Sequence, residues 1–400
     1  MTSTIRSDIY EASTTNGVTT VRGNGSGTVA ISDNTAITGT LSATGATTLS
    51  SQAYPTAGGL WSGRNMVING AMNVSQRGVS FTSVAATAYH LDRFQYNLNG
   101  TVGASTVTQQ ADGPNGFKNS LKIDVTTADA SLASGDRLTL CYKFEGQDLQ
   151  RVKKGTADAE KLILSFWVKA TKTGTQIVEL FDHDNTRHCA KSYTVSSGDT
   201  WEYKTVEYPA DTTGALDDDN ANSISIFFGL ACGTDYTSGT LATTWAANTN
   251  ANRFVGQVNN FDSTSNNFQI TGVQLECGDA ATSFEYEIIS ETLQKTQRYY
   301  QKSYAIDTAP ATSVGTHLQS KVDSTTYNFF KIPPMVWFRA APTVVLYSTT
   351  GASGNMRNLS TSADVAAWAG GYAGGILAHN TAAVTSGQNI ALHYTAAAEI

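Results

Sequence analysis

Leu162-Ile163-Leu164-Ser165-Phe166-Trp167-Val168-Lys169 is the stretch that decides the fold class of this 400-residue chain. Every second residue from Leu162 to Val168 is apolar, which is the pattern of a strand with one buried face. The same alternation recurs in three other runs: Leu121–Val125, Leu138–Phe144 and Ile224–Phe228. Because glycine-rich turn signals separate the runs and no helical pattern lies between them, residues 61–289 predict a jelly-roll β-sandwich.

The segment before this sandwich, residues 1–60, is poor in aromatic residues and rich in Thr, Ser, Gly and Ala. Ile37-Thr38-Gly39-Thr40-Leu41 is echoed by Ala43-Thr44-Gly45-Ala46-Thr47-Thr48-Leu49. Such a segment lacks the apolar surface for a core of its own. It is interpreted as a fibrous shaft and virion-attachment segment that three chains form together, so the chain is expected to be a homotrimer. The alternative is a low-complexity leader without a fixed fold.

One helix is predicted after the sandwich, at residues 290–305. Ser290 is the expected N-cap and Glu291 suits the first turn, while Leu293 and Tyr304 belong to one apolar face. The helix is expected to connect the sandwich to the part of the chain that follows it.

Residues 306–400 return to strand patterns, at Thr343–Tyr347 and Asn389–Tyr394, and predict a sandwich-like β module for trimerisation or for the tip. A loop rich in Gly and Ala is expected at Ala369–Gly375 because it needs permissive backbone angles. The prolines that exclude a central strand at their own positions are Pro333, Pro334 and Pro342.

Composition narrows the classes of partner. The formal net charge is -7 with 15% charged residues, so the chain lacks the basic footprint of a nucleic-acid-binding protein. No apolar run approaches the roughly 18 residues of a membrane span, and no export signal is recognisable at the N-terminus. The four cysteines are scattered singly, which predicts free buried thiols and folding in a reducing cytoplasm.

Aromatic side chains are the candidate carbohydrate contacts, since a pyranose presents apolar faces that stack on indole or phenol rings. Tyr236 and Trp245 lie among small polar residues, in a pattern typical of a loop, and Asn248 and Asn250 follow closely as candidate partners for sugar hydroxyls. The alternative for Trp245 is that it closes one end of the sandwich.

A second pair of candidate sugar contacts, Trp368 and Tyr372, flanks the expected glycine-rich loop in the C-terminal module. They are interpreted as a receptor-contacting tip, with His379 and Asn380 expected nearby. The alternative is a trimer interface around Trp368. By contrast, Phe166, Trp167, Trp201 and Phe228 lie on patterned strands and are predicted to be packing residues.

Two acidic clusters are weak candidates for a structural calcium, and no other cofactor is expected. Asp182 and Asp184 fall on one side of a strand end, and Asp217 and Asp219 belong to a run of three aspartates. In both cases the alternative is a solvated polar loop.

Catalysis is not expected. There is no GxSxG elbow, and no local pair of carboxylates with aromatic flanks indicates a glycosidase.

Several stretches together resemble the carbohydrate-binding-module-like jelly rolls of bacteriophage tail fibres. They occur in the expected order over roughly residues 60–400. The segments that carry the resemblance are Asn65–Gly78, Tyr89–Phe94, Leu164–Ala170, Gly198–Lys204, Val273–Glu276 with Ser283–Glu285, Gln297–Tyr300, Ala340–Val344 and Ala396–Ile400.

The resemblance implies a non-catalytic receptor-binding protein of the virion, assembled in the host cytoplasm. Its N-terminus would attach to phage tail, baseplate or adaptor proteins, and the rest would bind a host surface glycan such as lipopolysaccharide or capsule. The rival interpretations are a tailspike-like polysaccharide depolymerase and a purely structural spacer of the virion.

Overall fold

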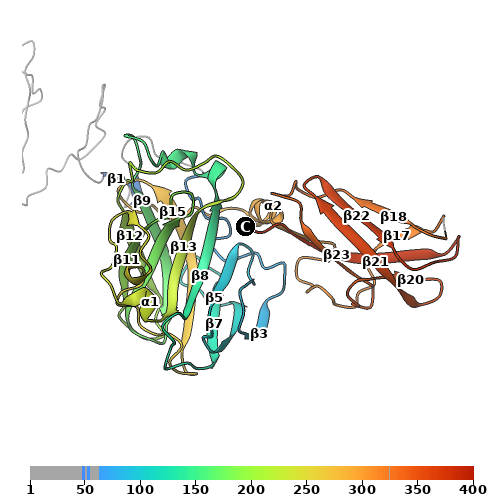
Figure 1. The fold of residues 1–400 in the computed structure, drawn as a ribbon, viewed down its shortest axis with the longest axis horizontal. Helices are drawn as coiled ribbons and strands as arrows, with labels where there is room; N and C mark the ends of the chain where they lie inside the picture. Colours follow the sequence, from blue (N-terminus) through green and yellow to red (C-terminus); the bar gives the residue numbers. More distant parts are fainter. Residues whose placement is uncertain (1–46, 50–51, 55–62, 324) are drawn as a thin grey trace, which may run out of the picture. The chain divides into compact units, whose positions relative to one another are not determined.

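The computed structural model describes residues 47–49, 52–54, 63–323 and 325–400 (Figure 1). Residues 46–400 form one compact unit. The predicted shaft at residues 1–60 lies outside the described residues, apart from two short antiparallel strands, β1 (Thr47–Leu49) and β2 (Gln52–Tyr54).

Two antiparallel sheets build the predicted jelly-roll region (Figure 1). The first has seven strands in the order β14-β11-β10-β13-β8-β5-β4, and the second has six in the order β12-β9-β15-β7-β6-β3. The strands of the seven-stranded sheet are β4 (Ala88–Tyr89), β5 (Phe94–Asn99), β8 (Arg137–Glu145), β10 (Gly174–Asp182), β11 (Arg187–Val195), β13 (Asn222–Cys232) and β14 (Ala246–Ala247). The strands of the six-stranded sheet are β3 (Ser80–Val84), β6 (Ala104–Gln110), β7 (Ser120–Thr127), β9 (Leu162–Ala170), β12 (Glu202–Tyr208) and β15 (Asn267–Cys277).

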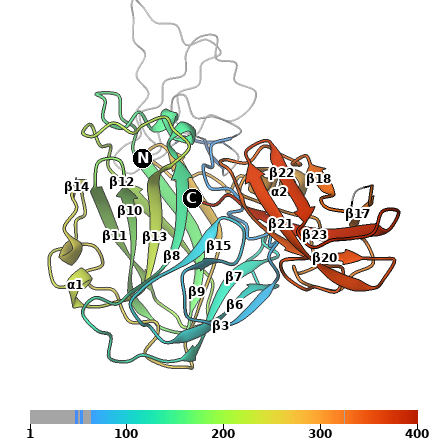
Figure 2. The ribbon, with the colours of Figure 1, turned by 45° about the vertical axis from the view of Figure 1, so that its right-hand side comes forward.

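Short helical turns connect some of these strands. They are η1 (Gly146–Asp148), η2 (Gln150–Val152), α1 (Thr234–Thr237) and η3 (Asn250–Asn252). Figure 2 shows α1 and β14 beside β11, at the edge of the seven-stranded sheet.

The core lies between the two sheets, where the alternating residues of β9 and β13 meet. Phe166 on β9 and Phe228 on β13 are fully buried, with ring centroids 5.1 Å apart in an edge-to-face arrangement. Burial of each such ring stabilises the fold by about 1.5–3 kcal/mol. The predicted alternation is therefore confirmed, because residues of one parity fill the interior while Trp167 and Lys169 lie on the outer face.

The segment Asn65–Gly78 pairs with β15 along the edge of the core. Met66 N donates to the Leu275 carbonyl at 2.9 Å, and Val273 N donates to the Gly70 carbonyl at 3.0 Å. A Cβ on Gly70 would lie 2.1 Å from the Val273 carbonyl oxygen, so this close approach requires glycine. Two stretches separated by about two hundred residues in the sequence thus form one structural element.

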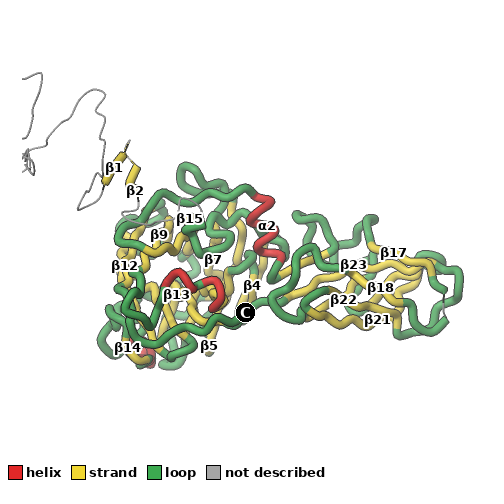
Figure 3. The backbone as a smooth tube through the Cα atoms, turned by 90° about the horizontal axis from the view of Figure 1, so that it is seen from above, coloured by secondary structure: helices red, strands yellow, loops and turns green. Residues whose placement is uncertain are grey.

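The helix is shorter than predicted. It is α2 (Ile289–Gln297), and its N-cap is Ile288, without a side-chain hydrogen bond, rather than Ser290. Figure 3 shows α2 in red, between the strands of the jelly roll and those of the C-terminal sheet. After it, β16 (Tyr300–Lys302) pairs with Ala397–Thr395 of the C-terminal sheet. Pairing with a strand so distant in sequence overrides the helical periodicity of this segment, which explains the error.

The C-terminal module is an antiparallel sheet of eight strands, centred on β23. Its strands are β16, β17 (Leu318–Lys321), β18 (Phe329–Ile332), β19 (Thr343–Tyr347), β20 (Asn355–Asn358), β21 (Ala363–Tyr372), β22 (Gly375–Asn380) and β23 (Asn389–Ala397). Buried side chains such as Met356, Ile376 and Leu392 make a second core. The prolines behave as predicted, since β18 ends before Pro333 and β19 begins after Pro342.

The predicted glycine-rich loop at Ala369–Gly375 is wrong. Residues up to Tyr372 belong to β21 and Gly375 begins β22, so the segment is a tight hairpin in which Tyr372 pairs with Gly375. The glycines in this hairpin leave room for neighbouring aromatic rings, because a Cβ on Gly370 would lie 2.6 Å from the Trp368 ring.

All four cysteines are free, and three of them are buried, in agreement with the sequence. None of the helices in the described part of the chain has the length and apolar character to cross a membrane.

Candidate functional site

The C-terminal sheet exposes aromatic rings on the face opposite its core. Phe329 on β18 pairs with His379 on β22, which pairs with Trp368 on β21, so three rings form one row across three strands. The centroid of the His379 ring lies 5.2 Å from each of the other two centroids. The strand period of two places Phe330 and Ala378, the next residues in line, in the core. We call this row and the three adjoining rings the aromatic face; its members are Tyr327, Phe329, Trp337, Trp368, Tyr372 and His379.

The rings of the aromatic face are open to solvent. Exposed fractions are 71% for Trp337, 56% for Phe329 and Tyr372, 50% for Tyr327 and 48% for Trp368. Scattered exposed aromatics are ordinary, but a contiguous group marks an interaction site.

Glycines allow three of these rings to lie close to the backbone. A Cβ on Gly370 would lie 2.6 Å from Cη2 of Trp368, so the indole covers the bare backbone of that residue. At the hairpin, a Cβ on Gly374 would lie 3.3 Å from the Tyr372 ring and 3.5 Å from the Trp337 ring. The Trp368 indole therefore contacts bare backbone and the His379 ring, while 48% of the residue stays exposed to a ligand.

Polar atoms lie along the edge of the row. His379 Nδ1 is 2.9 Å from the Asn380 carbonyl oxygen, which fixes the imidazole orientation. Tyr327 meets that imidazole edge-on at 5.0 Å. Lys331, two residues after Phe329 on β18, is also exposed. Flat rings beside hydrogen-bonding groups are the arrangement that a sugar requires, because its C–H face stacks while its hydroxyl groups need polar partners.

Tyr236 does not lie in an exposed loop as predicted. It belongs to α1 and is only 8% exposed, with the Arg137 guanidinium 5.1 Å from its ring centroid. Its ring packs with Cys141, Phe227 and Phe254 on the outer side of the seven-stranded sheet, so it offers no stacking surface.

Trp245 is half-buried and packs against the main core. Its Nε1 donates to the Pro209 carbonyl at 2.9 Å, which corresponds to the alternative in which this residue closes an end of the sandwich. Asn248 lies next to it, and its amide is 3.4 Å from the Asn250 side chain, so the two predicted amides do come together. Neither Tyr236 nor Trp245 presents an exposed ring beside these two amides.

The chain itself covers this part of the seven-stranded sheet. Arg253 makes a bidentate ion pair with Glu179, with a closest distance of 2.6 Å, and its guanidinium lies 4.7 Å from the Phe181 ring centroid. Burial alone would raise the pKa of Glu179, but Arg253 and His188 lower it overall, so the carboxylate stays charged in the interior. The segment that carries α1 is therefore fastened onto the sheet.

The predicted calcium ligands do not converge. Asp182 is buried and pairs with Lys154 Nζ at 2.6 Å, an internal cation that serves in place of a metal. Asp184 accepts from the Asp217 backbone amide at 3.1 Å, and Asp219 accepts from Ala221 N at 2.6 Å. Among residues that the structure describes, no group of three or more His, Cys, Asp or Glu side chains is placed to hold a metal ion.

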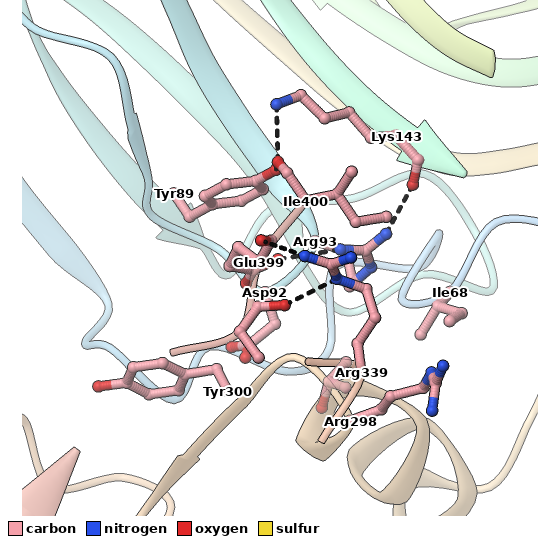
Figure 4. Close-up of polar contacts among 12 residues, drawn as sticks. Ile68, Tyr89, Asp92, Arg93, Lys143, Arg298, Tyr300, Arg339, Glu399 and Ile400 are labelled. Carbon is pink, nitrogen blue, oxygen red and sulfur yellow. Dashed lines mark hydrogen bonds and ion pairs between the residues drawn. The ribbon is translucent and has the colours of Figure 1, made fainter. Parts of the chain in front are cut away.

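Three of the resemblance motifs meet in one buried ion-pair cluster (Figure 4). Arg93 of the Tyr89–Phe94 motif donates to the Glu399 carboxylate at 2.9 Å, and its guanidinium lies 3.4 Å from the Tyr299 ring centroid. Tyr89 Oη and Lys143 Nζ both donate to the Ile400 carbonyl, at 2.8 and 2.7 Å. These motifs join the jelly roll to the C-terminal sheet, and their residues are structural.

The residues of the aromatic face that the sequence did not single out are Tyr327, Phe329 and Trp337, whereas His379 was expected near Trp368 and Tyr372 and does lie beside Trp368. Tyr327 and Phe329 are separated by one residue, a period-two signal in a segment assigned only as strand-like. The alignment of His379 with Phe329 and Trp368 could not be found in this way, because it depends on strand register.

No family model matches the chain, and no curated protein matches it. Among solved structures, it is similar to the enzymatically active domain of tailspike protein 4 of bacteriophage CBA120, with 16% identity and a TM-score of 0.29 over 54% of this chain and 21% of that one. It is also similar to the family 11 carbohydrate-binding module of Clostridium thermocellum, with 12% identity and a TM-score of 0.25 over 52% of this chain and 99% of that one. The match thus spans about a fifth of the tailspike domain. Scores this low carry no conclusion about the function of this chain.

Proposed function

We propose that this chain is a non-catalytic, multivalent tail-fibre protein that binds a host surface glycan, lipopolysaccharide or capsule, through its aromatic face. The observation that carries the proposal is the exposed row Phe329–His379–Trp368, in which the Trp368 indole covers the bare backbone of Gly370 and the residue is 48% exposed. The tail-fibre assignment draws on the resemblance of the sequence motifs.

Glycan binding suits this site for energetic reasons. Trp and Tyr contribute a large contact area with few rotatable bonds, so little side-chain entropy is lost when a ligand binds. The indole of Trp368 is already restricted by the backbone beneath it, which reduces that cost further. Each site is expected to be weak, and three copies in a homotrimer would raise avidity by about 10²–10⁴ through effective concentration.

Attachment to the virion is proposed for the N-terminal segment, with phage tail, baseplate or adaptor proteins as partners. The acidic composition is consistent with this non-nucleic-acid role, since the formal net charge is -7.

The test combines cell retention with product release. Purified wild-type protein and the variant Trp368→Ala/Tyr372→Ala are incubated with host cells and with extracted surface polysaccharide. Retention of the wild type, loss of retention in the variant and no new reducing ends are expected. The appearance of new reducing ends would overturn the proposal and indicate that the chain is a polysaccharide depolymerase.

A second interpretation is favoured by the size of the exposed apolar surface, which also suits an interface between copies of the chain. Sedimentation of both proteins separates the two interpretations. If the variant becomes monomeric, the aromatic face is an assembly surface of a structural spacer. If its mass is unchanged and cell retention falls, the face binds the glycan.

A further inference from the structure

A second line of aromatic rings crosses the outer face of the six-stranded sheet. Tyr203 on β12 pairs with Trp167 on β9, and their ring centroids are 5.3 Å apart. Further along, Phe117 lies 5.4 Å from Tyr286. We call Tyr203, Trp167, Phe117 and Tyr286 the aromatic strip. Its two ends are the open ones, with Tyr203 44% and Tyr286 60% exposed.

A glycine in a β-bulge makes the strip continuous. Gly272 has φ +63°, at the point where the register between β15 and β9 shifts. A Cβ there would lie 2.8 Å from Cζ of Phe117 and 3.1 Å from Cδ1 of Trp167, so both rings reach over the same bare backbone. Four rings from two strands and two loops therefore follow one another without a gap.

Hydrogen-bonding side chains flank the strip on the same face. Lys169 pairs in register with Gln269, which pairs with Lys122. Lys169 Nζ donates to Asp112 at 2.8 Å, and Trp201 Nε1 lies 3.4 Å from the other Asp112 oxygen. The hydrogen bond from Lys169 holds the pKa of Asp112 below its usual value, so this carboxylate is an acceptor at neutral pH.

The shape of this surface indicates which class of ligand binds to it. A protein interface has a broad apolar core depleted in charge. Here the apolar part is a line of rings, broadened at one end by Phe284, which packs against Phe117 and Tyr286. The ion pairs Lys169–Asp112 and Lys122–Asp124 lie beside it. A thin ligand with apolar faces and hydroxyl edges matches that arrangement, and donors and acceptors occur in balance, so no net charge on the ligand is favoured.

We propose that the aromatic strip binds an unbranched, uncharged polysaccharide chain, with successive pyranose rings stacked along Tyr203, Trp167, Phe117 and Tyr286. This site lies in the jelly roll and is separate from the aromatic face. It rests on the proposed function only in taking a glycan as ligand. Four consecutive rings suit several sugar residues, so affinity rises with chain length.

The test is affinity electrophoresis of the full chain in gels that contain hydroxyethylcellulose, dextran, galactomannan or the acidic polysaccharide alginate. The variant is Tyr203→Ala/Tyr286→Ala, which removes the two exposed rings and leaves the packed pair in place. Thr205→Ala, on the same face of β12, is the matched control, and near-ultraviolet circular dichroism confirms that each variant is folded. The variant Trp368→Ala/Tyr372→Ala is run alongside.

Retardation of the wild type by at least one of the three neutral polysaccharides is expected, with at least a fivefold loss of affinity in Tyr203→Ala/Tyr286→Ala and none in Thr205→Ala. Retardation by alginate alone, by none of the four, or equally in the strip variant would overturn the proposal. If the strip variant loses retardation but wild-type protein does not bind host cells, the strip stands and the proposed function fails. If cell retention depends on Trp368 and Tyr372 while retardation in the gels does not depend on the strip, the proposed function stands and the proposal for the strip fails.

Discussion

Arg93 and Glu399 form a buried ion pair of 2.9 Å between residues that lie 306 positions apart in the sequence. Glu399 also accepts from Arg77 at 2.9 Å, so one carboxylate joins two cations of the jelly roll to the last strand region of the C-terminal sheet. These ion pairs therefore anchor the C-terminal sheet, which carries the proposed glycan-binding site, to the jelly roll.

Replacing Glu399 by Ala is expected to lower the free energy of unfolding by about 3–5 kcal/mol, because Arg93, 1% exposed, would keep its charge in the interior without its partner. Urea denaturation at fixed protein concentration measures the change. Glu160→Ala, which removes an exposed pair with Lys153, is the control and should leave the urea midpoint nearly unchanged, because solvent screens this pair. Equal midpoints for both variants would show that the junction is not a stabilising contact.

The stability of the fold is expected to fall as pH decreases from about 6.5 to about 4, through His90. Burial, with a smaller contribution from Arg77, lowers the pKa of His90 from 6.5 to about 4, so the folded state resists a proton that the unfolded chain accepts. The contribution is fully present above pH 6.5 and falls by up to about 3 kcal/mol by pH 4.

His90→Phe isolates this effect, since a phenyl ring keeps the stacking on Phe81, whose centroid is 4.7 Å away. Urea denaturation at several pH values between 7 and 4 gives the difference between the two proteins. A difference that does not change with pH would mean that His90 takes up its proton in the folded state.

Gly370→Ala is expected to weaken glycan binding without unfolding the module. The new methyl group would lie 2.6 Å from Cη2 of Trp368 and push the indole off the sheet, which removes one stacking contact. A loss of about three- to tenfold in affinity corresponds to the roughly 0.5–1.5 kcal/mol of one aromatic contact. Stability should change by less than about 1 kcal/mol, because only a mobile ring end has to move.

The matched control is Gly315→Ala, where nothing lies within 4 Å of the added Cβ. Tryptophan fluorescence reports the displaced indole, and cell-retention titrations report affinity. Unaltered binding together with altered fluorescence would exclude the Trp368 indole from the contact.

Calcium is expected to leave the melting temperature unchanged, since Lys154 already neutralises Asp182 and lies 3.0 Å from Asp211. Lys154→Met should cost about 3–5 kcal/mol by leaving a buried carboxylate unpaired, and adding Asp182→Asn should recover part of that loss. Calorimetry of the three proteins, each with CaCl2 and with EDTA, measures both effects. A higher melting temperature of the wild type in CaCl2 would reveal a site for the cation.

The sequence predicts the β architecture well because the apolar residues that alternate along a strand are the ones that face the core. The run Leu162–Val168 identifies its own inward face without any knowledge of its neighbours, and Phe166 is indeed in the core. The prolines that end strands and the free thiols follow equally from local chemistry. For Trp368, an aromatic residue in a small-residue context, the sequence identifies an exposed ring correctly.

The same reasoning fails where a distant segment decides the outcome. Tyr236 has a loop-like sequence context, but the segment around it folds back on the sheet and is fastened by Arg253 to Glu179. Helix periodicity continues past Gln297, yet Tyr300–Lys302 becomes a strand because β23 supplies a partner. The sequence by itself thus determined which residues face inward on each strand. Only the tertiary structure decided which outer faces stay open and which register aligns their rings, because coverage and register depend on contacts between segments that are not neighbours in the sequence.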